Sequence, residues 1–334
     1  MKILLLRKRG EWAYGSPLYF HEFEQELAKH TDCVNAGPGW PLYREGETVD
    51  QTVKRIYGDD PPEWVIDRER VEKLNPNRQY MVGHHLSDIH GRISAGVRSP
   101  EMLLELINKI GYDAIFMKAP YIYNAKVSPT YFTEYLKPPW YFVPYSVDPD
   151  KFYPRFPKKH DITLIGSVAE RYPLRNAVWA EMPEFCRQHG LTYLMNNKGP
   201  RPSWEAAKWE NDPEYYIRDR YAEALGLSRF FIFCGGIYGY PVQKYFEVPA
   251  SGCLPLVDKL KGVGDFLGFV DGENYVVVNK NNWKERLLYY HKHEDEAQRI
   301  IENGRKLVLS RHTHKIRTQE FLNILETFIL EGET

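Results

Sequence analysis

A glycine-rich stretch of the sequence places groups that attract anions close to a carboxylate. The segment "FCGGIYGYPVQKYFE" (233–247) joins a strand-like run to a helix, with Lys244 and Glu247 one helical turn apart. Backbone N–H groups of such a loop and of the helix N-terminus attract anions, and Lys244 adds a point charge. Glu247 then either binds the hydroxyl groups of a ligand or is a first-turn carboxylate favoured by the helix dipole, with glycines that only permit the turn.

A second glycine turn lies in "LIGSVAERYPLR" (164–175), where Gly166 and Ser167 follow an apolar run. A glycine at a strand end lets a phosphate approach the backbone, and Arg171 or Arg175 could pair with it. A plain turn between a strand and a helix, with surface arginines, explains the segment equally well. The stretch has neither GxGxxG nor the Walker pattern, which argues against dinucleotide and P-loop sites.

A cluster of histidines occurs in "GHHLSDIHG" (83–91), which contains His84, His85, Asp88 and His90. Histidine titrates near neutral pH, so the cluster suits general-base catalysis or hydrogen bonding to sugar hydroxyls. Histidine and aspartate are also metal ligands, although no HExxH-like spacing is present. A structural role for at least two of the histidines is a further interpretation.

These residues need elements that position them, and the first half of the chain reads as alternating strands and helices. Helices are expected at 15–30, where Ser16 is a natural N-cap and Pro17 a natural first residue, and at 99–111. Short buried strands are expected at 2–6, 63–67, 79–83, 113–117 and 140–144.

A second α/β unit is expected to begin near residue 160. The stretch 144–161 carries four prolines and several charges, which is typical of a linker. Strands are then expected at 161–167, 191–195, 229–234, 253–258 and 274–278, followed by a helical tail. The pattern predicts an α/β protein with two Rossmann-like units and a cleft between them, with ligands at the carboxyl ends of the strands.

Composition narrows the class of protein. The 334 residues carry a net charge of −1, which argues against a nucleic-acid or membrane-surface binder. The four cysteines lack metal spacing and indicate a reducing compartment. No apolar run reaches the ~18 residues of a membrane span, and "MKILLLRKRG" reads as a strand rather than a signal peptide. We therefore expect a cytoplasmic protein.

Several segments together resemble the glycosyltransferases of the GT-B fold, and most closely the family-4-like group that includes the spore maturation protein CgeB. The C-terminal segments that resemble this group are "KYFEVPASGCLPLVD", "DGENYVVV" and "RKLVLSRHTHKIRTQEFL"; the upstream ones are "GPGWP", "PYSVDPDKFYP" and "DITLIGSVAERYPLR". The resemblance implies two Rossmann-like α/β domains facing each other across a cleft. It places an acceptor-side domain at 1–150, a linker at 151–160, a nucleotide-sugar-binding domain at 161–312 and a C-terminal helix at 313–334 that crosses back to the N-terminal domain.

The resemblance also implies roles for individual residues on the donor side. Family-4 enzymes have a Glu-x7-Glu motif whose second glutamate binds the ribose, and Glu247 matches it. The first glutamate would stand at Gly239, beside Tyr240, so this chain departs from the motif that contacts the donor sugar. The diphosphate contacts map to Arg171 or Arg175 and to Lys244, with the turns Gly166–Ser167 and Gly15–Ser16 near the donor phosphates.

On the catalytic side, the resemblance places His85, Asp88 and His90 near the reacting sugar. It implies a metal-independent, retaining enzyme without a cofactor, whose donor is a nucleotide sugar such as a UDP- or GDP-sugar. The acceptor is unknown and is expected to be a glycan, a protein or a small molecule, and from the composition we expect no nucleic-acid partner and no membrane span. The glycine at position 239 motivates an alternative, a non-catalytic nucleotide- or glycan-binding assembly protein. A metal-dependent hydrolase built on the histidines is a third possibility.

Overall fold

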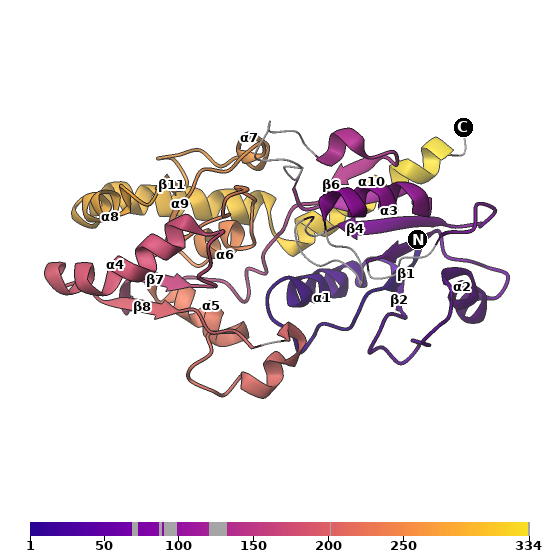
Figure 1. Ribbon diagram of the computed structural model, residues 1–334, viewed down its shortest axis with the longest axis horizontal. Coiled ribbons are helices and arrows are strands. Elements are labelled where there is room, and N and C mark those ends of the chain that lie inside the picture. Colours follow the sequence, from indigo (N-terminus) through magenta and orange to yellow (C-terminus); the bar gives the residue numbers. More distant parts are fainter. Residues whose placement is uncertain (69–72, 87–88, 90–98, 120–131, 201, 333–334) are drawn as a thin grey trace. The chain divides into compact units, whose positions relative to one another are not determined.

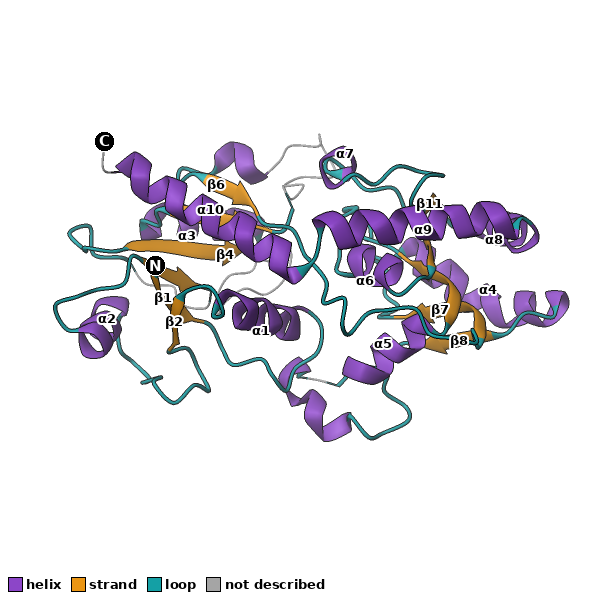
Figure 2. Cartoon of the chain, turned by 180° about the vertical axis from the view of Figure 1, so that it is seen from behind, coloured by secondary structure: helices purple, strands orange, loops and turns teal. Residues whose placement is uncertain are grey.

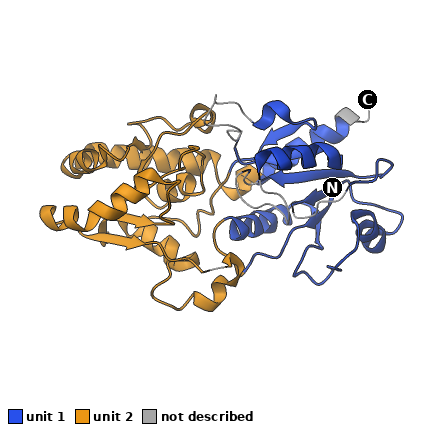
Figure 3. Cartoon of the chain, in the orientation of Figure 1, with its two compact units in different colours: residues 1–11, 16–144, 318–334 blue, residues 12–15, 145–317 orange. Residues whose placement is uncertain are grey.

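The computed structural model describes residues 1–68, 73–86, 89, 99–119, 132–200 and 202–332 (Figure 1). The chain forms two compact units (Figure 3). Unit 1 comprises Met1–Glu11, Ser16–Pro144 and Thr318–Thr334, and unit 2 comprises Trp12–Gly15 and Tyr145–Arg317. The chain thus passes into unit 2 after Pro144 and returns to unit 1 at Thr318.

Unit 1 is built on a parallel sheet of six strands in the order β2-β1-β3-β4-β5-β6. Because every neighbouring pair is parallel, the carboxyl ends of these strands lie along one edge. The strands are β1 (Lys2–Leu6), β2 (Asp32–Asn35), β3 (Trp64–Asp67), β4 (Met81–Leu86), β5 (Ala114–Met117) and β6 (Trp140–Phe142).

Helices pack against this sheet, and local sequence signals explain where they begin (Figure 2). Ser99 caps α3 by accepting a hydrogen bond from the Met102 amide, and Pro100 is its first residue. The helical elements of unit 1 are α1 (Ser16–Leu27), α2 (Val49–Tyr57), α3 (Pro100–Ile110), the short η1 (Phe132–Tyr135) and the C-terminal α10 (His314–Gly332), whose first four residues belong to unit 2.

Unit 2 contains a second parallel sheet, of five strands in the order β11-β10-β9-β7-β8. Its strands are β7 (His160–Ile165), β8 (Tyr193–Asn196), β9 (Ser228–Phe233), β10 (Leu254–Val257) and β11 (Val276–Val277). Its helical elements are α4 (Pro173–His189), η2 (Ser203–Trp209), α5 (Arg218–Gly226), α6 (Lys244–Ala250), α7 (Gly264–Leu267), α8 (Trp283–Lys292) and α9 (Glu294–Arg311).

The core of unit 2 sits between this sheet and its helices. Ile162, Phe230 and Leu256 from the strands pack with Val178 of α4 and Trp283 of α8. The near-continuous apolar strands reflect a sheet that is covered on both faces. Two parallel α/β units were predicted from the sequence, and the structure confirms them. None of the described helices is both long enough and apolar enough to span a bilayer.

Candidate functional site

The carboxyl edge of the unit 2 sheet gathers the glycine turns that the sequence singled out. Gly166 follows β7 and has a φ of +149°, a conformation that favours glycine. A Cβ atom at Gly166 would lie 3.1 Å from Nη1 of Arg175 and 3.9 Å from Cε of Lys244. The turn after β7 therefore meets two cationic side chains from two different helices.

Arg175 holds the turns after β7 and β9 together. Its guanidinium donates from Nη1 to the Ser167 carbonyl at 2.9 Å and from Nη2 to the Cys234 carbonyl at 2.9 Å. It is 7% exposed and lies 3.7 Å from the centroid of the Tyr172 ring. Arg171, the alternative phosphate partner from the sequence, is exposed, and its carbonyl accepts from the Ile237 amide at 3.0 Å. The geometry favours Arg175 as the cation of this edge.

Lys244 is the first residue of helix α6, and its ammonium group is available to a ligand. Its ammonium forms no hydrogen bond and no ion pair with any residue that the structure describes, and it lies 5.1 Å from the centroid of the Tyr221 ring. Burial lowers the pKa of Lys244 to about 8, with the nearby Arg175 acting in the same direction and Glu247 opposing it. A half-buried ammonium of this kind suits an anionic ligand.

Glu247 lies one turn further along α6 and is 8% exposed. The Tyr221 hydroxyl, from α5, donates to its Oε2 at 2.9 Å, so the carboxylate is oriented by a neighbouring helix. Burial and the adjacent Glu247 carboxylate raise the pKa of Tyr221 well above its usual range, which keeps this hydroxyl a donor. Tyr221 thus contacts both functional side chains of α6, Glu247 through its hydroxyl and Lys244 through its ring.

Asp258 orders the glycine-rich loop, a role that the sequence did not predict. It directly follows β10, and its Oδ1 accepts from the Gly235 amide at 2.8 Å. Burial raises its pKa to about 6, although the hydrogen bonds from this loop and the charge of Arg175 oppose that shift. The aspartate that ends "CLPLVD" is visible in the sequence as a polar residue directly after a strand. The sequence does not show that this aspartate contacts a loop some twenty residues earlier.

The same loop contains Gly239 and Tyr240. Gly239 has a φ of +64°, and a Cβ atom there would lie 2.7 Å from Cγ of Lys261. The Tyr240 ring stacks on Tyr238 with centroids 5.4 Å apart. The backbone at position 239 therefore suits glycine and would be strained by a glutamate.

Comparisons with known proteins identify the unit that carries this site. Residues 162–323 match the family model described as glycosyl transferase-like. We call residues 162–323 the glycosyltransferase-like domain, after the family model that they resemble. It contains all the residues of the edge described above, from Gly166 to Asp258. No curated protein matches the chain significantly.

Solved structures resemble the chain over nearly its whole length. Sucrose-phosphate synthase from Thermosynechococcus elongatus is 13% identical with a TM-score of 0.65, covering 99% of this chain and 100% of that one. HepE from Anabaena, in complex with UDP and glucose, is 11% identical with a TM-score of 0.63, covering 98% and 100%. A glycosyltransferase from Rickettsia africae is 13% identical with a TM-score of 0.61, covering 98% of each chain.

At these identities the likeness shows the fold, which is the GT-B fold. The predicted GT-B fold is therefore confirmed. The match of residues 162–323 to the glycosyl transferase-like family agrees with the predicted class of enzyme. The narrower relationship to family 4 and to the CgeB-like group stays a prediction.

Two predicted donor residues precede the glycosyltransferase-like domain in the chain. Gly15 has a φ of +67° and open space where a Cβ atom would lie, and it belongs to unit 2. Its neighbour Tyr14 donates its amide proton to the Ser203 carbonyl at 3.1 Å. Ser16 is the first residue of α1 in unit 1. The placement of Gly15 and Ser16 near donor phosphates stays a prediction.

The predicted catalytic histidine lies in the core of unit 1. His85 is 2% exposed, and its ring packs against Phe20, Phe23, Phe116 and Phe321. Burial lowers its pKa well below the usual range, and the Lys118 and Arg7 charges add to the effect. These surroundings favour a structural role for His85. Asp88 and His90 lie outside the described residues.

The residue types of the histidine cluster also suit a metal site. Within the parts of the chain that the structure describes, no group of three or more histidine, cysteine, aspartate or glutamate side chains is placed to hold a metal ion. Nδ1 of His84 is buried and lies 3.9 Å from the Asp67 carboxylate, which is too long for a hydrogen bond.

Proposed function

We propose that the protein is a glycosyltransferase that moves a sugar from a nucleoside-diphosphate sugar to the hydroxyl group of an acceptor. The observation that carries the proposal is the convergence of Gly166, Arg175 and Lys244 at a strand edge of the glycosyltransferase-like domain. HepE from Anabaena has been solved with UDP-glucose and with UDP and glucose, which makes a UDP-sugar the first donor to test.

The proposed reaction breaks the bond between the anomeric carbon and the β-phosphate oxygen. The diphosphate leaves with the bonding electrons, the acceptor oxygen bonds to the anomeric carbon, and the acceptor proton is released. Negative charge grows on the β-phosphate, where the Lys244 ammonium, the Arg175 guanidinium and the loop amides would stabilise it without a metal ion. By analogy with single oxyanion-hole donors, each contact would contribute about 3 kcal/mol to the transition state.

Glu247 is proposed to bind the ribose hydroxyls of the nucleotide. A carboxylate accepts two hydrogen bonds from a vicinal diol, and the Tyr221 hydroxyl fixes its orientation. We also propose that the configuration at the anomeric carbon is retained, as the resemblance to family 4 implies. Because position 239 is glycine, we propose that groups other than a glutamate there contact the donor sugar.

A calorimetric titration tests the proposal. The protein is titrated with UDP, GDP, ADP and the corresponding nucleotide sugars, in the presence and absence of EDTA, and donor hydrolysis is followed over hours. Saturable binding and slow hydrolysis, both unaffected by EDTA, support a metal-independent transferase. Binding without hydrolysis or transfer would favour the non-catalytic assembly protein, and the absence of any binding would overturn both.

Affinity for UDP is expected to fall as the pH rises through about 8, the pKa of Lys244. The ammonium form binds the diphosphate, so below pH 8 the charge is already present, whereas above it binding must take up a proton. Linkage then lowers the affinity by up to about tenfold per pH unit until the pKa of the complex is reached.

Calorimetry between pH 7 and 9.5 measures this dependence. Lys244→Arg is the matched control, because arginine stays protonated throughout this range and should remove the fall. An affinity of the wild-type protein that does not change across the interval would contradict the role given to Lys244.

A further inference from the structure

A cavity of about 580 Å³ lies at the amino edge of the unit 2 sheet. Its wall includes Arg229 and Phe230 at the start of β9, and Gly252 in the turn that precedes β10. The proposed donor site lies at the carboxyl edge of the same sheet, so the cavity is a separate feature of unit 2. Its volume falls within the range of about 300–1,000 Å³ that is usual for ligand pockets.

The linker and helix α9 complete the wall of the cavity. On α9, Ala297, Ile301 and Arg305 recur at intervals of four residues and therefore share one face of the helix. The linker contributes Lys158 and Phe156, which is 77% exposed. Ala297 belongs to the core of unit 2, and Ile301 packs against that core. The apolar part of the wall therefore continues the core of unit 2.

Arg305 brings a positive charge to this wall. Its side chain is half-buried, and its buried Nε has no hydrogen-bond partner. Its guanidinium forms no ion pair with any residue that the structure describes. An arginine can only donate hydrogen bonds, and a buried donor without an acceptor costs free energy. A ligand that supplies acceptor oxygens at this position would remove that cost.

Lys158 adds a second cation, which the ends of two helices hold in place. Its Nζ donates to the carbonyl of Gly226, the last residue of α5, at 2.8 Å, and to the carbonyl of Gly252, just after α6, at 2.9 Å. An ammonium has three protons, so one donor remains. No carboxylate in the described part of the chain forms an ion pair with Lys158, and burial lowers its pKa. An anion in the cavity would offset the cost of burying this charge.

The carboxylates of the same wall are either paired or exposed. Glu294 accepts from Nη2 of Arg229 at 2.7 Å, and Glu302 accepts from the side-chain amide of Gln298 at 2.8 Å. Asp295 is exposed in the first turn of α9, where the helix dipole favours a negative charge. The wall therefore offers two half-buried cations to a ligand, next to an apolar surface.

We propose that this cavity binds a small amphiphilic anion, a ligand that joins a phosphate or carboxylate group to an apolar, ring-sized body. The anionic oxygens would bond to Arg305 and Lys158, because arginine forks match such oxygens in pairs and lysine adds a point charge. The apolar body would lie on Phe156 and Ile301, where the burial of ring surface favours binding. The site is independent of the proposed function, since none of these residues belongs to the donor site.

Calorimetric titration of the protein with phenyl phosphate, and separately with phenylacetate, tests the site. We expect saturable binding that Arg305→Gln weakens by about 10- to 100-fold, as expected for the loss of hydrogen bonds to a charged group. Arg305→Lys should restore part of the affinity. Phe156→Ser should weaken binding by about 3- to 10-fold, the range of one aromatic contact. The probe that binds more tightly names the anionic group.

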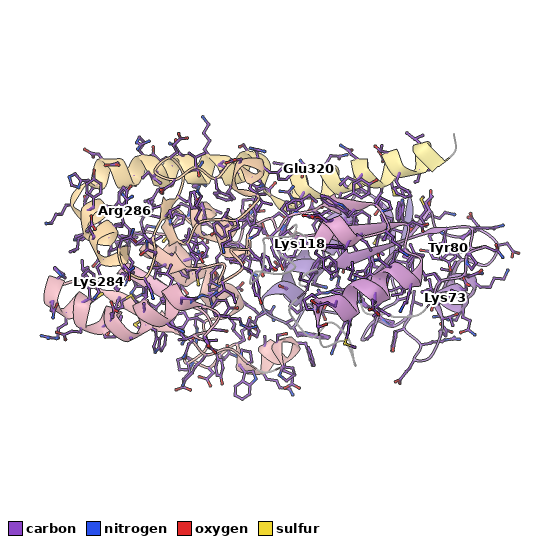
Figure 4. All side chains as sticks on the ribbon, turned by 45° about the horizontal axis from the view of Figure 1, so that its top comes forward. Lys73, Tyr80, Lys118, Lys284, Arg286 and Glu320 are labelled. Carbon is purple, nitrogen blue, oxygen red and sulfur yellow. The ribbon has the colours of Figure 1, made fainter. Side chains whose placement is uncertain are left out.

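Arg286→Gln is the matched control for charge. Arg286 lies on α8 of the same unit (Figure 4) and does not line the cavity, so its replacement should leave the binding unchanged. Benzyl alcohol, which has a ring but no charge, should bind at least tenfold more weakly than the tighter anion. Lys158 is left intact because it holds the ends of α5 and α6.

Thermal unfolding checks that each variant is folded, and Phe156→Ser, at an exposed position, decides if Arg305→Gln does not fold. The absence of saturable binding of either anion, binding that Arg305→Gln leaves unchanged, or equally tight binding of benzyl alcohol would overturn the site. Because phenyl phosphate also fits the phosphate site proposed for the donor, the titrations are repeated with saturating UDP. Binding that persists and depends on Arg305 upholds the cavity site, and binding that UDP abolishes overturns it. A failure of UDP to bind would contradict the proposed function alone, since the Arg305 variants still locate the anion.

Discussion

Replacing Lys244 with glutamine is expected to lower kcat/KM for the nucleotide sugar by about 100- to 1000-fold, the range measured for loss of one oxyanion-stabilising donor. Glutamine keeps a polar side chain of similar size but cannot carry the charge that meets the leaving diphosphate. Stability should stay the same or rise slightly, because a half-buried ammonium without a hydrogen bond to any described residue costs desolvation energy in the native state.

Steady-state hydrolysis or transfer, measured with thermal unfolding, separates the two effects. Lys259→Gln is the matched control, because Lys259 is an exposed lysine of the same unit, next to Asp258. It should change kcat/KM by no more than about twofold, as expected for surface charges. If kcat/KM of Lys244→Gln stays within a few-fold of the wild-type value, Lys244 does not stabilise the leaving diphosphate.

Replacing Glu247 with glutamine is expected to weaken UDP binding by about 10- to 100-fold, since hydrogen bonds to a charged group contribute about 1.5–3 kcal/mol. The amide can accept one hydrogen bond from the ribose but loses the charge and one acceptor. The Tyr221 hydroxyl, which donates to Glu247 at 2.9 Å, would still find an oxygen, so the fold should be preserved.

A nucleotide lacking the ribose hydroxyls provides the matched control for Glu247. Dideoxy-UDP should bind the wild-type protein about as weakly as UDP binds Glu247→Gln, and the variant should not distinguish the two nucleotides. A carboxylate that served only the dipole of α6 would give a different outcome. UDP affinity would be unchanged, and stability would fall by about 0.3–1 kcal/mol.

Much of the architecture could be predicted because it depends on local patterns. Apolar runs such as 2–6 and 113–117 contain strands β1 and β5, and the Ser99-Pro100 pair marks the start of α3. The glycine turns after β7 and β9 were recognised for the same reason, since each follows an apolar strand directly.

The partners within the site could not be predicted, because they depend on contacts between distant segments. The choice between Arg171 and Arg175 needed the Cys234 carbonyl, which lies on another strand end. Tyr221 and Asp258 were missed because their partners, Glu247 and Gly235, come from other elements.

The histidine cluster shows a different limit of sequence analysis, because a strong local pattern predicted a catalytic role for His85 whereas its buried surroundings favour a structural one. Three histidines and an aspartate within nine residues favour catalysis by composition alone. The enclosure of His85 depends on Phe321, in the last helix of the chain, which stacks on its ring with centroids 5.2 Å apart. The sequence around residue 85 cannot predict that contact, because Phe321 lies far away in the chain.

A crystal structure of the protein soaked with UDP and a UDP-sugar tests the central claim most directly. We predict nucleotide density at the carboxyl edge of the unit 2 sheet, with the diphosphate within hydrogen-bond reach of the Lys244 ammonium and the Gly166 turn. The ribose hydroxyls should bond to the Glu247 carboxylate. A nucleotide bound elsewhere, or one whose ribose and diphosphate avoid Glu247 and Lys244, would contradict the proposed donor site.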